Sequence, residues 1–131
     1  MDAEPLLTIQ IAEDSPGIRD LLLTHLDLVP GVKVTAASPT AAEALERLRQ
    51  APPALLVLDL QLESGSALDI LKKLPQDPPR PRVIILTNHS GPETRAACEA
   101  AGADFFFDKS SEFAPFLDTV RALAASTTGG L

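Results

Sequence analysis

The run Leu55-Leu56-Val57-Leu58 is followed directly by Asp59, and this step from aliphatic residues to a carboxylate constrains the fold more than any other stretch. Successive apolar residues of this kind predict a strand that is buried on both faces, as in a parallel sheet. An ionised Asp inside such a strand would be costly, so Asp59 is expected where the strand emerges. Open α/β sheets hold their ligands at the carboxyl ends of strands, which makes Asp59 the first candidate functional residue.

The remaining sequence alternates between segments typical of strands and segments typical of helices. Further strands are expected at 6–12, 32–36, 83–86 and 105–107. Helices are expected to begin near Ser15-Pro16, Ser38-Pro39-Thr40, Ser64-Gly65-Ser66, Ser90-Gly91-Pro92 and Ser110-Ser111, with the third over about 67–74 and the fourth closed by Gly102. Five strands alternating with five helices predict an α/β fold with a single doubly wound parallel sheet.

One domain is expected to span residues 1–131, with its core at about 5–124 and a frayed tail at 125–131. Four prolines lie between residues 75 and 81, and this stretch is interpreted as a stiff loop because another buried strand follows it. The single cysteine, Cys98, has no partner for a disulfide within the chain and is interpreted as a small buried hydrophobe.

Charge and hydropathy limit the partners that we expect. The formal net charge of −7 argues against nucleic-acid binding, which depends on clustered basic residues, and it would suit either an acidic cation site or solubility. No apolar run approaches the ~20 residues of a membrane span, so no membrane association is expected. The acidic N-terminus has no signal-peptide pattern, and the cytoplasm is the expected compartment.

Reactive side chains follow four of the expected strands, and a parallel sheet would bring them to one edge. They are Glu13, Asp14, Asp59, Thr87 and Lys109. Two carboxylates about 4 Å apart repel by about 4 kcal/mol at an effective dielectric near 20, and Mg²⁺ suits such a set of oxygen ligands. An Asp can accept a phosphoryl group as an acyl phosphate, with an ammonium and a hydroxyl as partners for its oxygens.

In their order and positions, these motifs resemble the receiver domain of bacterial two-component response regulators. The motifs are Glu13-Asp14, Leu58-Asp59-Leu60, Thr87 and Lys109, and the resemblance covers about residues 5–124. It implies a flavodoxin-like (βα)5 fold with strand order 2-1-3-4-5, in a stand-alone, chemotaxis-receiver-like response regulator. Such a protein is a phosphoacceptor in a phosphorelay rather than a conventional enzyme, although it could dephosphorylate itself.

The resemblance implies a metal site around the phosphoacceptor. Asp59 would take the phosphoryl group from a phosphohistidine on a sensor histidine kinase or a histidine phosphotransfer protein. Mg²⁺ would be the cofactor, held by Asp14, Asp59 and the backbone carbonyl of Gln61, with Glu13 acting through a metal-bound water.

The resemblance also implies a switch that reports the added charge. Lys109 would pair with Asp59 before phosphorylation and with the phosphoryl group afterwards. Thr87 would hydrogen-bond a phosphoryl oxygen, and Phe106 would turn into the space that Thr87 leaves. The change would be read by a protein output partner on the surface of the fourth helix, fifth strand and fifth helix, and it could also favour a homodimer.

Several positions depart from the usual pattern of this family. Glu63 and Ser110 stand where proline is common, and Asn88 stands where a small residue is usual. Gln61 and His89 occupy the positions that tune dephosphorylation in the family. Glu63 and Asn88 keep open a receiver-like interaction domain that works without phosphorylation, while a haloacid-dehalogenase-like phosphatase would call for an acid at Gln61.

Overall fold

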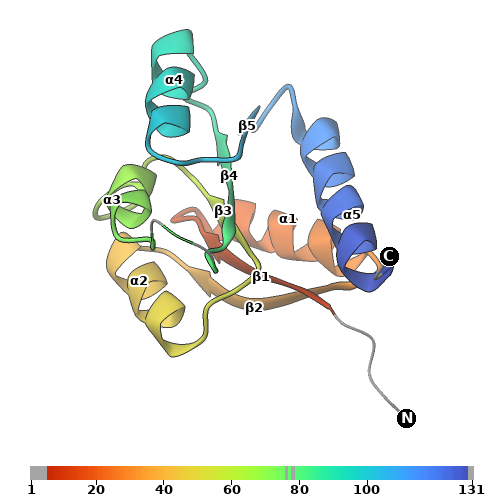
Figure 1. Cartoon of the computed structure of the whole chain (residues 1–131). Helices are drawn as coiled ribbons and strands as arrows, with labels where there is room; N and C mark the ends of the chain where they lie inside the picture. The colour runs from red at the N-terminus through yellow and green to blue at the C-terminus, as the bar shows by residue number, and fades with distance from the viewer. Residues whose placement is uncertain (1–5, 76, 78, 130–131) are drawn as a thin grey trace.

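The chain folds into one five-stranded parallel sheet between two layers of helices (Figure 1). The computed structural model describes residues 6–75, 77 and 79–129. The elements in chain order are β1 (Leu7–Ala12), α1 (Pro16–Asp27), β2 (Val32–Ser38), α2 (Ala41–Gln50), β3 (Leu55–Leu58), α3 (Ala67–Lys72), β4 (Arg82–Thr87), α4 (Pro92–Ala100), β5 (Phe105–Asp108) and α5 (Phe113–Gly129). The strand order is β2-β1-β3-β4-β5, which confirms the expected fold and topology.

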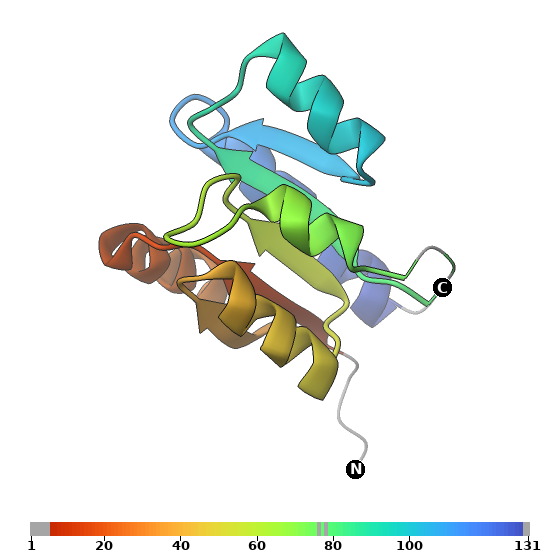
Figure 2. The same ribbon diagram turned by 90° about the vertical axis from the view of Figure 1, so that its left-hand side faces the viewer.

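The central strand β3 is buried along its whole length, as its aliphatic sequence predicts. Successive side chains point to opposite faces of the sheet. Leu55 and Val57 pack under α1 and α5, whereas Leu56 and Leu58 pack under α2, α3 and α4. Figure 2 shows the second of these layers in front of the sheet. Burying each such side chain contributes roughly 1.5–3 kcal/mol, so the apolar run holds both helix layers to the sheet.

Local signals place the helix ends close to the predicted positions. The Ser15 hydroxyl accepts the N–H of Ile18, and Pro16 is the first residue of α1. Ser66 and Asp69 form a reciprocal capping box at the start of α3. Gly102 closes α4 with φ of 109°, a conformation that favours glycine.

Some boundaries differ from those expected. Helix α3 ends at Lys72 rather than Leu74, because Pro75 disfavours helical geometry at the residue before it. Strand β2 continues to Ser38, whose carbonyl accepts the N–H of Glu13. Helix α5 continues to Gly129, past residue 124, and Ala124 is still buried against the sheet.

The start of α5 corrects one expected cap. Ser110 and Ser111 lie in the turn before α5, which begins at Phe113, and their N–H groups donate to the carboxylate of Asp108 at 2.9 Å each. An ionised acceptor makes stronger hydrogen bonds to backbone N–H than a hydroxyl does, so Asp108 fixes this turn ahead of the helix.

Some expectations lie outside the described residues. They concern Met1–Pro5, Gln76, Pro78 and the last two residues of the tail. Among the helices that the structure describes, none has the length and apolar character needed to cross a membrane.

Candidate functional site

Three carboxylates meet at the carboxyl edge of the sheet, where β1 and β3 lie side by side. Ala12 pairs with Leu58 as the last residues of these strands, so the residues that follow them emerge together. The N–H of Asp59 donates to the carbonyl of Ala12 at 2.9 Å and fixes this exit. One carboxylate oxygen from each of Glu13, Asp14 and Asp59 lies within 4.8 Å of the others.

Lys109 bridges two of these carboxylates. Its Nζ donates to Oε1 of Glu13 at 2.7 Å and to Oδ2 of Asp59 at 3.1 Å. The side chains are only 12% (Lys109), 2% (Glu13) and 12% (Asp59) exposed, so solvent screens the ion pairs little. The contact with Asp59 is the one expected for Lys109, whereas sequence reasoning missed the shorter contact with Glu13.

The charges at this edge do not cancel, because three carboxylates face one ammonium. Burial raises the pKa of Glu13, and the nearby charge of Asp59 adds to that effect, while the hydrogen bonds from Lys109 and from the N–H of Ser15 oppose it. For Lys109, burial lowers the pKa, but the Glu13 hydrogen bond and the charges of Asp59 and Glu13 outweigh burial, so the net pKa is raised. A hard divalent cation fits this oxygen-rich, electron-rich donor set.

Gln61 and Glu63 lie in the loop between this edge and α3, and both are exposed. Gln61 pairs with Ser66 in an isolated antiparallel bridge, in which the N–H of Leu62 donates to the carbonyl of Gly65. Gly65 makes this turn with φ of 94°. The bridge gives the backbone around Gln61 a defined path beside the carboxylates.

Thr87 ends β4 and is fully buried. Its hydroxyl accepts the N–H of His89 at 3.1 Å, so in this structure it belongs to a tight turn at the end of the strand. The carbonyl of Thr87 accepts the N–H of Lys109 at 2.9 Å. The two predicted phosphoryl-contacting residues are therefore joined directly through their backbones, while His89 and Asn88 are exposed beside them.

Phe106 points into the core on the α2–α3–α4 side and is 5% exposed. The guanidinium of Arg95 lies 4.6 Å from the centre of its ring and donates to its carbonyl at 3.2 Å. Arg95 also pairs with Glu112 at 3.4 Å, which joins α4 to the loop before α5. Sequence reasoning identified Phe106 but missed Arg95 and Glu112, and movement of the ring stays a prediction.

Two further hydrogen bonds join the loops that follow β4 and β5. The hydroxyl of Ser90 donates to Oδ2 of Asp108 at 2.6 Å, and the hydroxyl of Ser110 donates to Oδ1 of Asn88 at 3.0 Å. The Ser90 bond is the largest cause that lowers the pKa of Asp108 to about 2, with further contributions from Ser110 and Ser111. Sequence reasoning singled out Asn88 and Ser110 separately but missed their contact.

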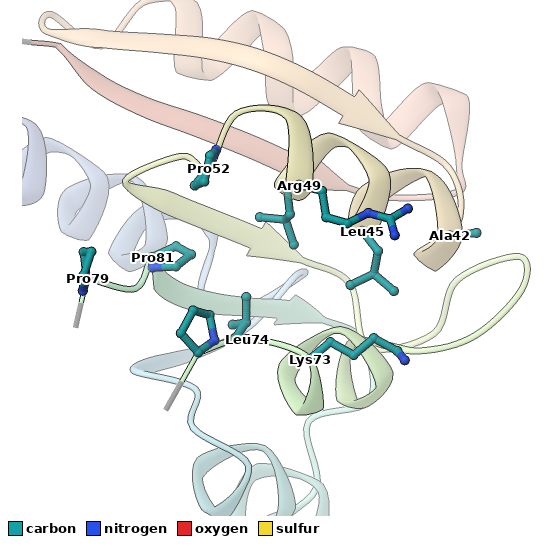
Figure 3. A pocket seen from close by; sticks show the side chains of 10 residues that line it. Ala42, Leu45, Arg49, Pro52, Lys73, Leu74, Pro79 and Pro81 are labelled. Carbon is teal, nitrogen blue, oxygen red and sulfur yellow. The ribbon is translucent and has the colours of Figure 1, made fainter. Parts of the chain in front are cut away.

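An apolar hollow of about 510 Å³ lies elsewhere, between α2 and the proline-rich segment that follows α3 (Figure 3). It is lined by Ala42, Leu45, Leu48, Arg49, Pro52, Lys73, Leu74, Pro75, Pro79 and Pro81. None of these is one of the carboxylates, and their chemistry offers no phosphoryl acceptor. The reactive edge of the sheet, rather than this hollow, is therefore the candidate site.

Comparisons with known proteins agree with the fold. Residues 9–121 match the response regulator receiver domain family. A protein-glutamate methylesterase/protein-glutamine glutaminase of the group 3 operon of Cereibacter sphaeroides is 33% identical over 75% of this chain and 26% of its own length. The nitrate/nitrite response regulator protein NarP of Escherichia coli is 31% identical over 87% of this chain and 53% of its own length.

A solved structure extends the agreement to three dimensions. A two-component response regulator of the LuxR family from Aurantimonas sp. SI85-9A1 has a TM-score of 0.83 and 26% identity, over 94% of this chain and 88% of that chain. The chain spans about a quarter to a half of the length of the curated relatives above. The sequence match, the strand order and the acidic edge agree, and the chain belongs to the response regulator receiver domain family.

Proposed function

We propose that this receiver domain accepts a phosphoryl group on Asp59 and passes the change to a protein partner in a two-component pathway. The observation that carries the proposal is the position of the Asp59 carboxylate. Asp59 directly follows the central strand, and its carboxylate lies close to both the acidic pair and the Lys109 ammonium. The donor would be a phosphohistidine on a sensor histidine kinase or a histidine phosphotransfer protein. The cytoplasm is the compartment that suits such a donor.

The proposed reaction is an in-line transfer. A carboxylate oxygen of Asp59 attacks phosphorus, the new O–P bond forms as the P–N bond breaks, and the imidazole leaves and takes up a proton. The Nζ of Lys109 lies 3.1 Å from the Asp59 carboxylate, and it can pair with the phosphoryl oxygens once they carry the negative charge. The Thr87 hydroxyl is a suitable second donor once its turn with His89 opens.

Mg²⁺ fits the residues present. Asp14 and Asp59 would hold it together with the backbone carbonyl of Gln61, and Glu13 would contribute charge from beside Lys109. When bound, the ion supplies positive charge against the oxygens of the transferring group. The chain's own contribution is the fixed spacing of the carboxylates at the ends of β1 and β3.

The output would depend on the charge that phosphorylation adds, about −1.5 to −2 at neutral pH. Thr87 and Phe106 lie on neighbouring strands, since Ile85 pairs with Phe106 and Thr87 pairs with Asp108. A shift at Thr87 can therefore reach the surface of α4, β5 and α5, where a protein partner or a second copy would bind. To shift the ratio of active to inactive conformation from 1:99 to 99:1, phosphorylation must stabilise the active conformation by about 5.5 kcal/mol relative to the inactive one.

The experiment is to incubate the protein with Mg²⁺ and acetyl phosphate and to follow its intact mass. We expect a gain of one phosphoryl group that is lost in Asp59→Asn and kept in Asp118→Asn, which removes an exposed carboxylate on α5. EDTA should abolish the gain. Absence of labelling with acetyl phosphate and with phosphoramidate would overturn the proposal in favour of a receiver-like interaction domain that works without phosphorylation.

A further inference from the structure

The loops that follow β4 and β5 are joined at two points. Ser90 donates to Asp108 at 2.6 Å, and Ser110 donates to Asn88 at 3.0 Å. Both contacts start from the strand pair that ends with Thr87 opposite Asp108. Side-chain hydrogen bonds therefore continue the connection between β4 and β5 beyond the end of the sheet.

We infer that these two contacts form a clasp that positions Thr87 and Lys109 for phosphoryl transfer at Asp59. The inference rests on the proposed function. Its four members, Asn88, Ser90, Asp108 and Ser110, are positioning residues, because they act through Thr87 and Lys109.

Chain connectivity is the first reason. Asn88 follows Thr87 directly, while Asp108 and Ser110 flank Lys109 on both sides. The backbone N–H of Lys109 is already bonded to the carbonyl of Thr87 at 2.9 Å. The two side-chain hydrogen bonds lie close to this backbone bond, so they limit how far Thr87 or Lys109 can shift without the other.

The second reason is the number of bonds that Asp108 accepts. One of its oxygens accepts the N–H groups of Ser110 and Ser111, and the other accepts the Ser90 hydroxyl. The Asp108 carboxylate is ionised at neutral pH, and these hydrogen bonds lower its pKa to about 2, that of the Ser90 hydroxyl most. The backbone directly after Lys109 is thus held by charge-assisted hydrogen bonds, which are the stronger kind.

The third reason is that the clasp makes sense of two departures from the family pattern. Ser110 stands where a proline would restrict the backbone through its ring, and Asn88 stands where a small residue is usual. In this structure Ser110 is restricted by its N–H bond to Asp108 and by its hydroxyl bond to Asn88. Lys109 still reaches Glu13 and Asp59, so its position is kept without the proline.

The first test compares Ser90→Ala and Ser110→Ala with the matched control Thr119→Ala, which removes a hydroxyl bonded to a helix carbonyl on α5. We expect each clasp variant to slow labelling by acetyl phosphate by about 2- to 10-fold, the effect of one lost hydrogen bond. Ser110→Thr, which keeps a hydroxyl, should restore the rate. Mg²⁺ affinity should stay within about 2-fold, because the carboxylates of the edge are untouched.

A background variant separates positioning from a general loss of stability. In Lys109→Met the Ser110→Ala change should slow labelling less than it does in the unmodified protein, because one of the two groups through which the clasp acts is gone. An equal slowing in both backgrounds would overturn the inference, as would a slowing by Thr119→Ala of the same size.

A second readout does not depend on phosphorylation. The ¹⁵N signal of the Lys109 ammonium should be visible at low temperature in the unmodified protein, and its proton exchange should rise several-fold in Ser90→Ala and Ser110→Ala. If the protein is never labelled but exchange rises, the proposed function fails, and what remains of the inference is that the clasp holds the Lys109 side chain in place. If exchange is unchanged, the clasp is refuted whatever the labelling shows.

Discussion

Replacing Asp59 with Asn should make the protein more stable when no divalent cation is present. The Asp59 carboxylate lies within 4.8 Å of carboxylate oxygens from Glu13 and Asp14, and 3.1 Å from the Lys109 ammonium. At an effective dielectric near 20, each repulsion is about 3.5 kcal/mol and the attraction is about 5 kcal/mol. The balance is about 2 kcal/mol of repulsion, which the neutral amide removes.

Mg²⁺ should narrow the difference in stability between the unmodified protein and Asp59→Asn. An ion bound only by the folded state at ten times its Kd adds about 1.4 kcal/mol to the free energy of unfolding, and the Asn variant should gain less because it has lost a ligand. Urea unfolding followed by circular dichroism, in EDTA and in Mg²⁺, measures both effects.

The control is Asp118→Asn, which removes an exposed charge and should change stability by less than about 1 kcal/mol. If Asp59→Asn unfolds at lower urea than the unmodified protein in EDTA, the carboxylates do not form a repulsive set. If Mg²⁺ stabilises both proteins equally, Asp59 is not a ligand.

Other predictions concern the turn, the clasp and the core. Gly65→Ala should cost about 1–3 kcal/mol in urea unfolding, because φ is 94° and an added Cβ would lie 2.8 Å from that of Ala41; an unchanged midpoint would contradict the strain. Hydrogen bonds, that of Ser90 above all, lower the pKa of Asp108 from 3.8 to about 2. The ionised Asp108 therefore contributes fully to the free energy of unfolding above pH 3.8, and this contribution is lost as the pH falls toward 2. Asp108→Asn should flatten the acid limb of stability in that window, and an unaltered limb would refute this. Cys98 is fully buried, and burial together with the charge of Glu99 raises its thiol pKa, so iodoacetamide should modify it only after unfolding.

The sequence predicts the fold and the reactive edge because both depend on short, regular signals. An apolar run that ends on a carboxylate reports a buried strand and its exit, as at Leu58 and Asp59. Once the strands are parallel, their carboxyl ends must meet, so the gathering of Glu13, Asp59 and Lys109 follows from topology. The structure bears out this gathering.

The contacts between loops could not be predicted, because they have no periodic signal and join distant residues. Glu13 and Lys109 are 96 positions apart, and Ser90 and Asp108 are 18 apart. The stacking of Arg95 on Phe106 depends on how α4 packs beside β5. Side-chain hydrogen bonds of this kind depend on backbone positions that only the complete sheet defines.

The strand order has a consequence for local unfolding. Asp59 follows β3, which is hydrogen-bonded to β1 on one side and β4 on the other, whereas Lys109 follows β5 at the outer edge of the sheet. Edge elements open at lower free energy than central ones in hydrogen exchange. Asp59 is therefore expected to follow the strand that exchanges most slowly, whereas Lys109 follows an edge strand that is expected to open more readily. Partial opening of β5 would move the Lys109 ammonium away from Asp59 and leave Asp59 in place.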